Sequence, residues 1–281
     1  MPLLIREFVR SRRTLGYVLW ISFIIGLYSC LPMLHLFTPY SVLGERAPEL
    51  HAALSLVVGW LLVFRTNTAY ARWWEARTLW GSLVNASRNL ALKVNHLGAT
   101  AEVDQRRVGQ LIKDFAVALK DHLRNDSKGW KQRGSTREKD WTHAPLAIAN
   151  EIYSMIGKWK KNGEIDGEEL RVIDAEALRL MDICGGCERI HRTRVIGSYR
   201  VFARQCVILF LLTLPWGIAK NFGWWTVPLT TLTAYFMFGL EVVAEHVEEP
   251  FGYDDDDLDL ESLCLTISNS VSEVFDSTNL S

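Results

Sequence analysis

The residues best suited to metal chemistry in this chain are four consecutive aspartates, Asp254–Asp257, which follow Pro250-Phe251-Gly252. Carboxylate oxygens are hard ligands, and calcium takes six to eight such oxygens. The spacing is not that of an EF-hand, so a solvated acidic run is the alternative interpretation. We expect no cofactor to be required, with Ca²⁺ a candidate ligand at this acidic loop.

Two other groups of residues have the composition of a metal site. Cys184 and Cys187 have the CxxC spacing of a redox or zinc half-site, with His191 nearby, but no second cysteine pair completes it. Carboxylates also gather on one predicted helix together with a histidine, at Glu241, Glu245, His246 and Glu248. No second Glu-x-x-His occurs in another apolar run, as a di-metal carboxylate bundle would need. No nucleophile elbow, phosphate loop or metalloprotease motif is present. We therefore predict that the chain is not an enzyme, with a membrane-anchored metal-dependent enzyme or sensor as the alternative.

A stripe of bulky apolar residues forms a different kind of candidate site. Leu56, Trp60 and Phe64 recur every four residues, which places them on one face of a helix over about 12 Å of its axis. Contact with lipid or packing in a bundle is the simpler interpretation. The alternative is a hydrophobic constriction, which several copies of the stripe around an axis would form.

Four charge-free apolar runs must position these residues: 15–37, 50–64, 205–219 and 221–240. A helix of about 20 residues spans a hydrocarbon core of about 30 Å. Of the 31 lysines and arginines, only Arg46 and Lys220 lie in the two loops on one side of the resulting four-span topology. The positive-inside rule then predicts a multi-pass protein of the cell (plasma or inner) membrane, with both termini and the segment 65–204 in the cytoplasm.

The remaining pattern predicts an all-α protein without strands. The second apolar run continues as one helix to about residue 94, because apolar residues recur at steps of three and four without an intervening proline. Further helices are expected over 102–124, 145–160 and 166–183, with Gly185-Gly186 as a break. We divide the chain into 1–64, the helical domain 65–204, the spans within 205–243, and an acidic tail 244–281. No basic patch predicts nucleic-acid binding.

Three ordered strings together carry a resemblance to a known family. They are Phe64-Arg65-Thr66-Asn67-Thr68-Ala69-Tyr70-Ala71-Arg72-Trp73-Trp74-Glu75-Ala76-Arg77, Gly185-Gly186-Cys187-Glu188-Arg189-Ile190, and Glu249-Pro250-Phe251-Gly252-Tyr253 with the four aspartates. This sequence closely resembles the bestrophin family in its bacterial form, over essentially the whole chain. The resemblance implies a homopentamer with four transmembrane helices per protomer around a central pore. It also implies that Leu56, Trp60 and Phe64 line an apolar neck, where Trp60 departs from the usual smaller or phenyl side chain.

The resemblance further implies a second constriction on the cytoplasmic side. The family's Glu-Arg-Ile-x-x-Thr-Pro-Ile-Pro reads here as Glu188 to Ile196 without either proline. Val195 is the counterpart of the aperture side chain, and Ile196 is the alternative if the register slips by one residue. Cationic groups lie next to it, at His191, Arg192 and Arg194. Facing the lumen they would attract anions; alternatively they are solvated or pair with acidic residues of a neighbouring subunit.

The same resemblance assigns Asp254 and Asp257 as side-chain ligands of a calcium clasp, although Tyr253 replaces an acidic residue common in animal members. The function that it implies is passive conduction of monovalent anions such as chloride across the lipid bilayer. A cation-selective channel for sodium or potassium, with the same architecture, is the alternative.

Overall fold

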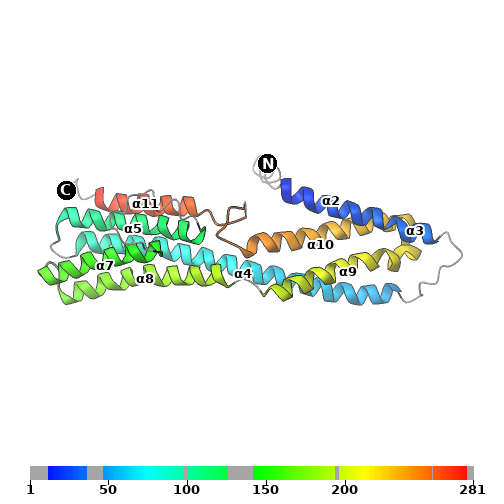
Figure 1. Ribbon diagram of the computed structural model, residues 1–281, viewed down its shortest axis with the longest axis horizontal. Helices are drawn as coiled ribbons and strands as arrows, with labels where there is room; N and C mark the ends of the chain where they lie inside the picture. Colours follow the sequence, from blue (N-terminus) through cyan, green and yellow to red (C-terminus); the bar gives the residue numbers. More distant parts are fainter. Residues whose placement is uncertain are drawn as a thin grey trace. The chain divides into compact units, whose positions relative to one another are not determined.

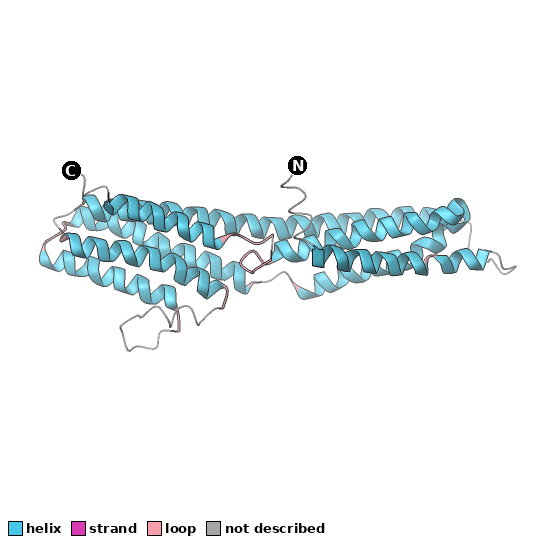
Figure 2. Ribbon diagram, turned by 90° about the horizontal axis from the view of Figure 1, so that it is seen from above, coloured by secondary structure: helices cyan, strands magenta, loops and turns pink. Residues whose placement is uncertain are grey.

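Helices account for the regular secondary structure throughout the part of the chain that the structure describes (Figure 2). The computed structural model describes residues 12–36, 47–97, 100–125, 142–193, 196–254 and 256–276. No strand occurs within these ranges, which confirms the all-α prediction.

The chain divides into two compact units. The first combines Met1–Trp73 with Arg194–Asp256, and the second combines Trp74–Thr193 with Asp257–Ser281. One helix, α4 (Ala47–His96), contributes residues to both units. Its 50 residues confirm the prediction that the second apolar run continues as a single long helix.

The first unit consists of apolar helices that pack side by side (Figure 1). Besides the first part of α4, they are α2 (Arg12–Tyr28), α3 (Cys30–Leu36), α9 (Gly197–Phe222) and α10 (Thr226–Glu248), with the short 3-10 helix η1 (Gly223–Trp225) between the last two. Four of these helices share one core, to which Val18 of α2, Leu62 of α4, Leu211 of α9 and Ala234 of α10 belong. Close packing of these side chains holds the four helices together.

Three stretches of the described chain are long and apolar enough to cross a membrane, namely Gly16–Leu34, His51–His96 and Gly197–Glu248. The third has 52 residues and contains both α9 and α10. A membrane crossing takes about 20 helical residues, so this stretch is more than twice the length that one crossing needs.

The second unit is a bundle of amphipathic helices. The remainder of α4 packs there with α5 (Glu102–Leu123), α7 (Ala144–Asn162), α8 (Gly167–Arg192) and α11 (Leu260–Asp276). Local signals fix several helix ends. Asp166 and Glu169 form a capping box at the start of α8, and Gly163, with φ of 74°, ends α7 in the left-handed conformation that glycine adopts without strain. The helices predicted over 102–124 and 145–160 correspond to α5 and α7.

The predicted break at Gly185-Gly186 is wrong, because α8 continues through both glycines to Arg192. A Cβ atom built on Gly186 would lie 3.0 Å from both terminal methyl groups of Leu79 in α4. Gly186 therefore lets α8 approach α4 closely, and the helical hydrogen bonds on either side are enough to retain it in the helix.

Candidate functional site

The two faces of α4 within the first unit have opposite environments. Val58, Leu62, Arg65 and Ala69 are buried against the other helices at steps of three and four residues. The stripe Leu56, Trp60 and Phe64 lies on another face, and these side chains are 73%, 74% and 54% exposed. Since residues 56 and 58 lie about 200° apart around the helix axis, burying one stripe necessarily turns the other outward. The sequence-predicted stripe is thus an apolar face that this protomer leaves uncovered.

This uncovered face is hollowed along the helix. An open groove runs between the bulky side chains, and it is lined by Ala52, Ser55, Leu56, Gly59, Trp60 and Val63. Small residues at positions 52, 55 and 59 create the hollow beside Leu56 and Trp60. Apart from the Ser55 hydroxyl, which donates to the Ala52 carbonyl at 2.7 Å, and the indole N–H of Trp60, the lining side chains are apolar. Water along such a surface would find few hydrogen-bonding partners.

A cluster of buried charges fixes how α4 is rotated. Arg65, next to Phe64, is 3% exposed, and its Nε lies 3.2 Å from Glu241 Oε2 of α10. Arg204 of α9 lies 3.4 Å from the same carboxylate and 3.1 Å from Glu245. The Arg65 guanidinium also lies 4.0 Å from Glu248. The carboxylates of α10 are therefore ion-paired with arginines, as charges buried in an apolar bundle must be.

Phe64, the last residue of the stripe, contacts the start of α9. The ring of Tyr199 meets Phe64 edge to face, with 5.6 Å between the ring centroids. The Tyr199 hydroxyl donates a hydrogen bond to the Leu61 carbonyl of α4 at 3.2 Å. Tyr199 is three residues beyond Ile196, so the segment predicted to form the aperture leads directly into a contact with the predicted neck. The sequence analysis did not identify this residue.

The structure describes only part of the segment that is predicted to form the aperture. Val195 and Arg194 lie outside the described residues. Ile196 is the N-cap residue of α9 and is 73% exposed, whereas His191 is half-buried near the end of α8. Arg192 is exposed and lies 3.8 Å from Glu188 of the same chain. Because the Arg192 side chain is 72% exposed and the separation is long for an ion pair, the pairing is weak and Arg192 remains able to reorient.

The acidic loop is held by contacts from α4. Trp73 Nε1 donates to the Asp256 carbonyl at 3.0 Å, and Arg72 Nε donates to the Glu248 carbonyl at 3.2 Å. Asp256 Oδ2 also lies 3.7 Å from His246 Nδ1. Of the two predicted calcium ligands, Asp254 is exposed and belongs to the first unit, while Asp257 is half-buried and belongs to the second.

These contacts give the recognisable strings a physical role. Arg72 and Trp73, from the string on α4, bind the backbone around the acidic loop. Glu75 from the same string forms an ion pair with Arg189, which belongs to the Cys-Glu-Arg-Ile string of α8. The string on α4 thus contacts each of the other two strings, through Trp73 with Asp256 and through Glu75 with Arg189.

The CxxC pair does not have the chemistry of a metal or redox site. Cys184 and Cys187 are fully buried in α8. Burial raises the pKa of Cys184 to about 12, assisted by the Glu188 carboxylate, and burial also raises the pKa of Cys187. Both side chains are therefore protonated at neutral pH, whereas the thiolate is the form that binds metals and attacks electrophiles.

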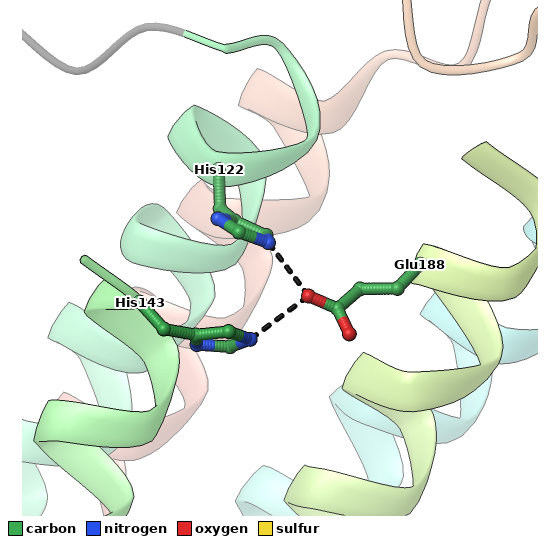
Figure 3. Close-up of side chains that lie close together, drawn as sticks. All are labelled: His122, His143 and Glu188. Carbon is green, nitrogen blue, oxygen red and sulfur yellow. Dashed lines mark hydrogen bonds and ion pairs between the residues drawn. The ribbon is translucent and has the colours of Figure 1, made fainter. Parts of the chain in front are cut away.

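A cluster that the sequence analysis missed lies in the second unit (Figure 3). His122 Nε2 and His143 Nε2 lie 2.6 and 2.8 Å from the same oxygen, Glu188 Oε1. Burial alone would raise the pKa of Glu188, but the hydrogen bonds and charge of His122 and His143 hold that pKa below its usual range. His122 and Glu188 are 66 residues apart, and no sequence motif joins them, so only folding brings them together.

Comparison with known proteins identifies relatives that are named as channels. The "Voltage-dependent anion channel-forming protein alr2987" of Nostoc sp. is 34% identical over 243 residues, which cover 83% of this chain and 77% of the relative. The "Voltage-dependent anion channel-forming protein YneE" of Escherichia coli K12 is 28% identical over 281 residues, covering 97% and 88%. These relatives are named as channels, which confirms the prediction that the chain is not an enzyme.

Solved structures share the fold. Two structures of the bacterial bestrophin homologue from Klebsiella pneumoniae, one of them a mutant, superpose with a TM-score of 0.84 at 23% identity. They cover 92% of this chain and 98% of their own. The family model described as "Bacterial/Fungal Bestrophin protein" matches residues 11–273. This match spans most of the 281 residues, and it confirms the resemblance carried by the three strings: the chain belongs to the bacterial and fungal bestrophin family.

Proposed function

We propose that this chain is the subunit of a passive channel for monovalent anions such as chloride, assembled as a homopentamer around a central pore. The observation that carries the proposal is the uncovered stripe Leu56, Trp60 and Phe64, opposite the buried face of α4. Five copies of this stripe around an axis would stack apolar rings into a neck that closes by excluding water. The relatives named as anion channel-forming proteins support the same function.

The membrane topology is part of the proposal. The stretch Gly197–Glu248 holds two helices of 26 and 23 residues, so each is long enough for one crossing. With the two stretches before it, this gives four spans per subunit. The concentration of lysine and arginine between residues 65 and 204 supports a topology in which that segment and both termini are in the cytoplasm and the channel is in the plasma membrane.

Selectivity for anions would come from charge near the cytoplasmic exit. Val195 or Ile196 forms the second constriction, and the adjoining cationic residues are His191, Arg192 and Arg194. In a ring of five subunits these groups would raise the local concentration of anions by Coulomb attraction. The weak pairing of Arg192 with Glu188 leaves its guanidinium available for this role.

Purified protein in a planar lipid bilayer tests the proposal directly. We expect discrete currents whose reversal potential follows the chloride gradient. Changing Leu56, Trp60 and Phe64 together to alanine should increase the open probability or abolish gating. The matched control changes Leu232, Phe236 and Leu240 of α10 to alanine, since these residues have the same spacing of four and are 52%, 58% and 47% exposed.

The outcomes separate the hypotheses. Unchanged gating in the neck variant, or an equal effect in the α10 control, would refute the neck assignment. A reversal potential that follows sodium or potassium would support the cation-selective alternative. Turnover of a substrate that depends on metal and is insensitive to the neck variant would support the enzyme alternative, although the carboxylates of α10 that such an enzyme would use are paired with Arg65 and Arg204.

Calcium binding by Asp254 and Asp257 is a separate part of the proposal. The donors suit the ion, because carboxylates and backbone carbonyls are its preferred ligands. Backbone carbonyls of the region already accept one hydrogen bond each, among them those of His246, Glu248, Glu249 and Asp256, and a carbonyl oxygen has a second lone pair. Calorimetric titration of the chelator-treated protein with CaCl2 should give a heat of binding. The double variant Asp254→Asn with Asp257→Asn should not give this heat. Equal heats from both proteins would refute this ligand set.

A further inference from the structure

Within the described residues, one group of three metal-ligating side chains lies close enough to share an ion: His122, His143 and Glu188. Their nearest ligand atoms all lie within 4.8 Å of one another. We infer that these three residues form a binding site for a divalent transition-metal ion of the zinc class. The inference does not depend on the proposed channel function.

Each of the three ligands lies at or near the end of a different helix. His122 lies in the last turn of α5, His143 is the N-cap residue of α7, and Glu188 projects from the last two turns of α8 (Figure 3). The two imidazole rings face each other with 4.5 Å between their centroids. Ends of three helices thus present two ring nitrogens and one carboxylate oxygen to a common point, as ligands in a pre-formed site must.

The donor set determines the class of ion. Imidazole nitrogen combined with a single carboxylate suits zinc, cobalt, nickel or copper, whereas calcium and magnesium prefer oxygen ligands alone. Three protein ligands leave a coordination position for water. The side chains are 23%, 24% and 20% exposed, so an ion can enter from solvent and still be partly shielded from it.

The observed distances are those of hydrogen bonds, and a small opening converts them into coordination. Glu188 Oε1 lies 2.6 and 2.8 Å from the two Nε2 atoms. Ligand atoms that bind zinc at about 2.1 Å in a tetrahedron are about 3.4 Å apart. The carboxylate therefore has to withdraw by less than about 1 Å, which rotation about the Glu188 side-chain bonds provides.

The hydrogen bond at the start of α7 shows where the exchangeable proton is. His143 Nδ1 accepts the Leu146 backbone N–H at 3.1 Å, so the neutral ring carries its proton on Nε2 and donates it to Glu188. A metal ion can bind Nε2 only in the other neutral tautomer, in which that proton has left Nε2 for solvent and a proton from solvent has been taken up at Nδ1. The ring then holds its single proton on Nδ1, and the Leu146 N–H loses its side-chain acceptor. Asparagine at position 143 would retain a capping side chain without this nitrogen ligand.

Calorimetric titration of the full-length, chelator-treated protein in detergent with ZnCl2 tests the site. We expect one zinc ion per chain, bound with a dissociation constant in the micromolar range or below, and unaffected by a large excess of MgCl2. Glu188→Gln, His122→Gln and His143→Asn should each weaken binding at least about tenfold, the scale of losses seen when zinc sites are perturbed. His96→Gln is the matched control, because His96 is an exposed histidine of the same unit outside the cluster, and it should bind as wild type does.

Cobalt substitution identifies the ligands spectroscopically. Co²⁺ at this site should give visible absorption bands of a tetrahedral or five-coordinate ion with nitrogen and oxygen ligands, and His143→Asn, which keeps the cap of α7, should abolish them. An intense near-ultraviolet thiolate band would assign the ion to a cysteine and overturn the inference. Zinc binding that is absent from wild type, or unchanged in all three variants, would show that the cluster is only a hydrogen-bonded carboxylate.

Discussion

Replacing Arg65 with methionine should be among the most damaging single changes in the first unit. Arg65 is 3% exposed, and it lies 3.2 Å from Glu241 and 4.0 Å from Glu248. Methionine fills much of the same volume but leaves the Glu241 carboxylate, which is 2% exposed, with Arg204 as its remaining cation at 3.4 Å. The variant thus retains buried negative charge while removing the cation that lies deepest in the bundle.

The magnitude follows from burial and from the remaining partner. Removing one member of a buried ion pair costs about 3–5 kcal/mol, mainly because the other charge stays desolvated. Arg204 is 45% exposed, so it screens Glu241 in part and places the expected loss at the lower end, about 3 kcal/mol. For a unit of this size that corresponds to a decrease of roughly 6–12 °C in Tm.

Thermal unfolding of the purified protein, followed by tryptophan fluorescence, measures this loss. The double variant Arg65→Met with Glu241→Leu should recover at least half of it, because the Glu241 carboxylate is then gone and only the longer 4.0 Å pairing with Glu248 stays lost. Arg171→Met is the control, since the Arg171–Glu168 pair is about 80% exposed and should shift Tm by no more than about 2 °C. A wild-type Tm for Arg65→Met, or a double variant less stable than the single one, would refute the reasoning.

Three further predictions concern individual contacts, each measured by the same unfolding assay. Tyr199→Phe retains the edge-on ring contact but loses the hydrogen bond to α4, so it should lower the free energy of unfolding by about 1 kcal/mol. Tyr199→Ala loses the ring contact as well and should lower it by about 2 kcal/mol. Equal losses from the two variants would show that the ring contributes nothing. Burial alone would raise the pKa of Glu176, but the Lys93 ammonium 2.9 Å away helps to hold that pKa below its usual 4.5. Glu176→Gln should therefore lower the free energy of unfolding by about 1–2 kcal/mol above pH 4.5. The difference in stability between this variant and wild type should disappear as pH falls through the lowered pKa of Glu176. A difference that persists in acid would contradict this assignment. Gly217→Ala should destabilise the first unit by about 1–3 kcal/mol, because the new methyl group would lie 2.5 Å from a histidine ring of α4. Gly239→Ala, which meets no atom within 4 Å, should instead stabilise α10 by up to about 1 kcal/mol.

Much of the fold could be predicted because it depends on local patterns. Charge-free runs, steps of three and four residues, and the absence of alternating segments predicted an all-helical chain and the continuity of α4. Gly185-Gly186 was misread because glycine lowers helix propensity only modestly, and the close packing of Gly186 against Leu79 is a tertiary effect. The stripe Leu56, Trp60 and Phe64 was visible in the spacing, yet the spacing could not show which face of α4 would be buried.

The helical class, the apolar stretches and, through three ordered strings, the family can be read directly from the order of the residues. Those properties depend on residues close together in the chain. Folding is what pairs Arg65 with Glu241, on the face of α4 that turns away from the stripe, and what brings His122, His143 and Glu188 to one point. Such contacts join residues 45 to 176 positions apart, and the free energy that selects them comes from burial and charge pairing between helices, which no local pattern encodes.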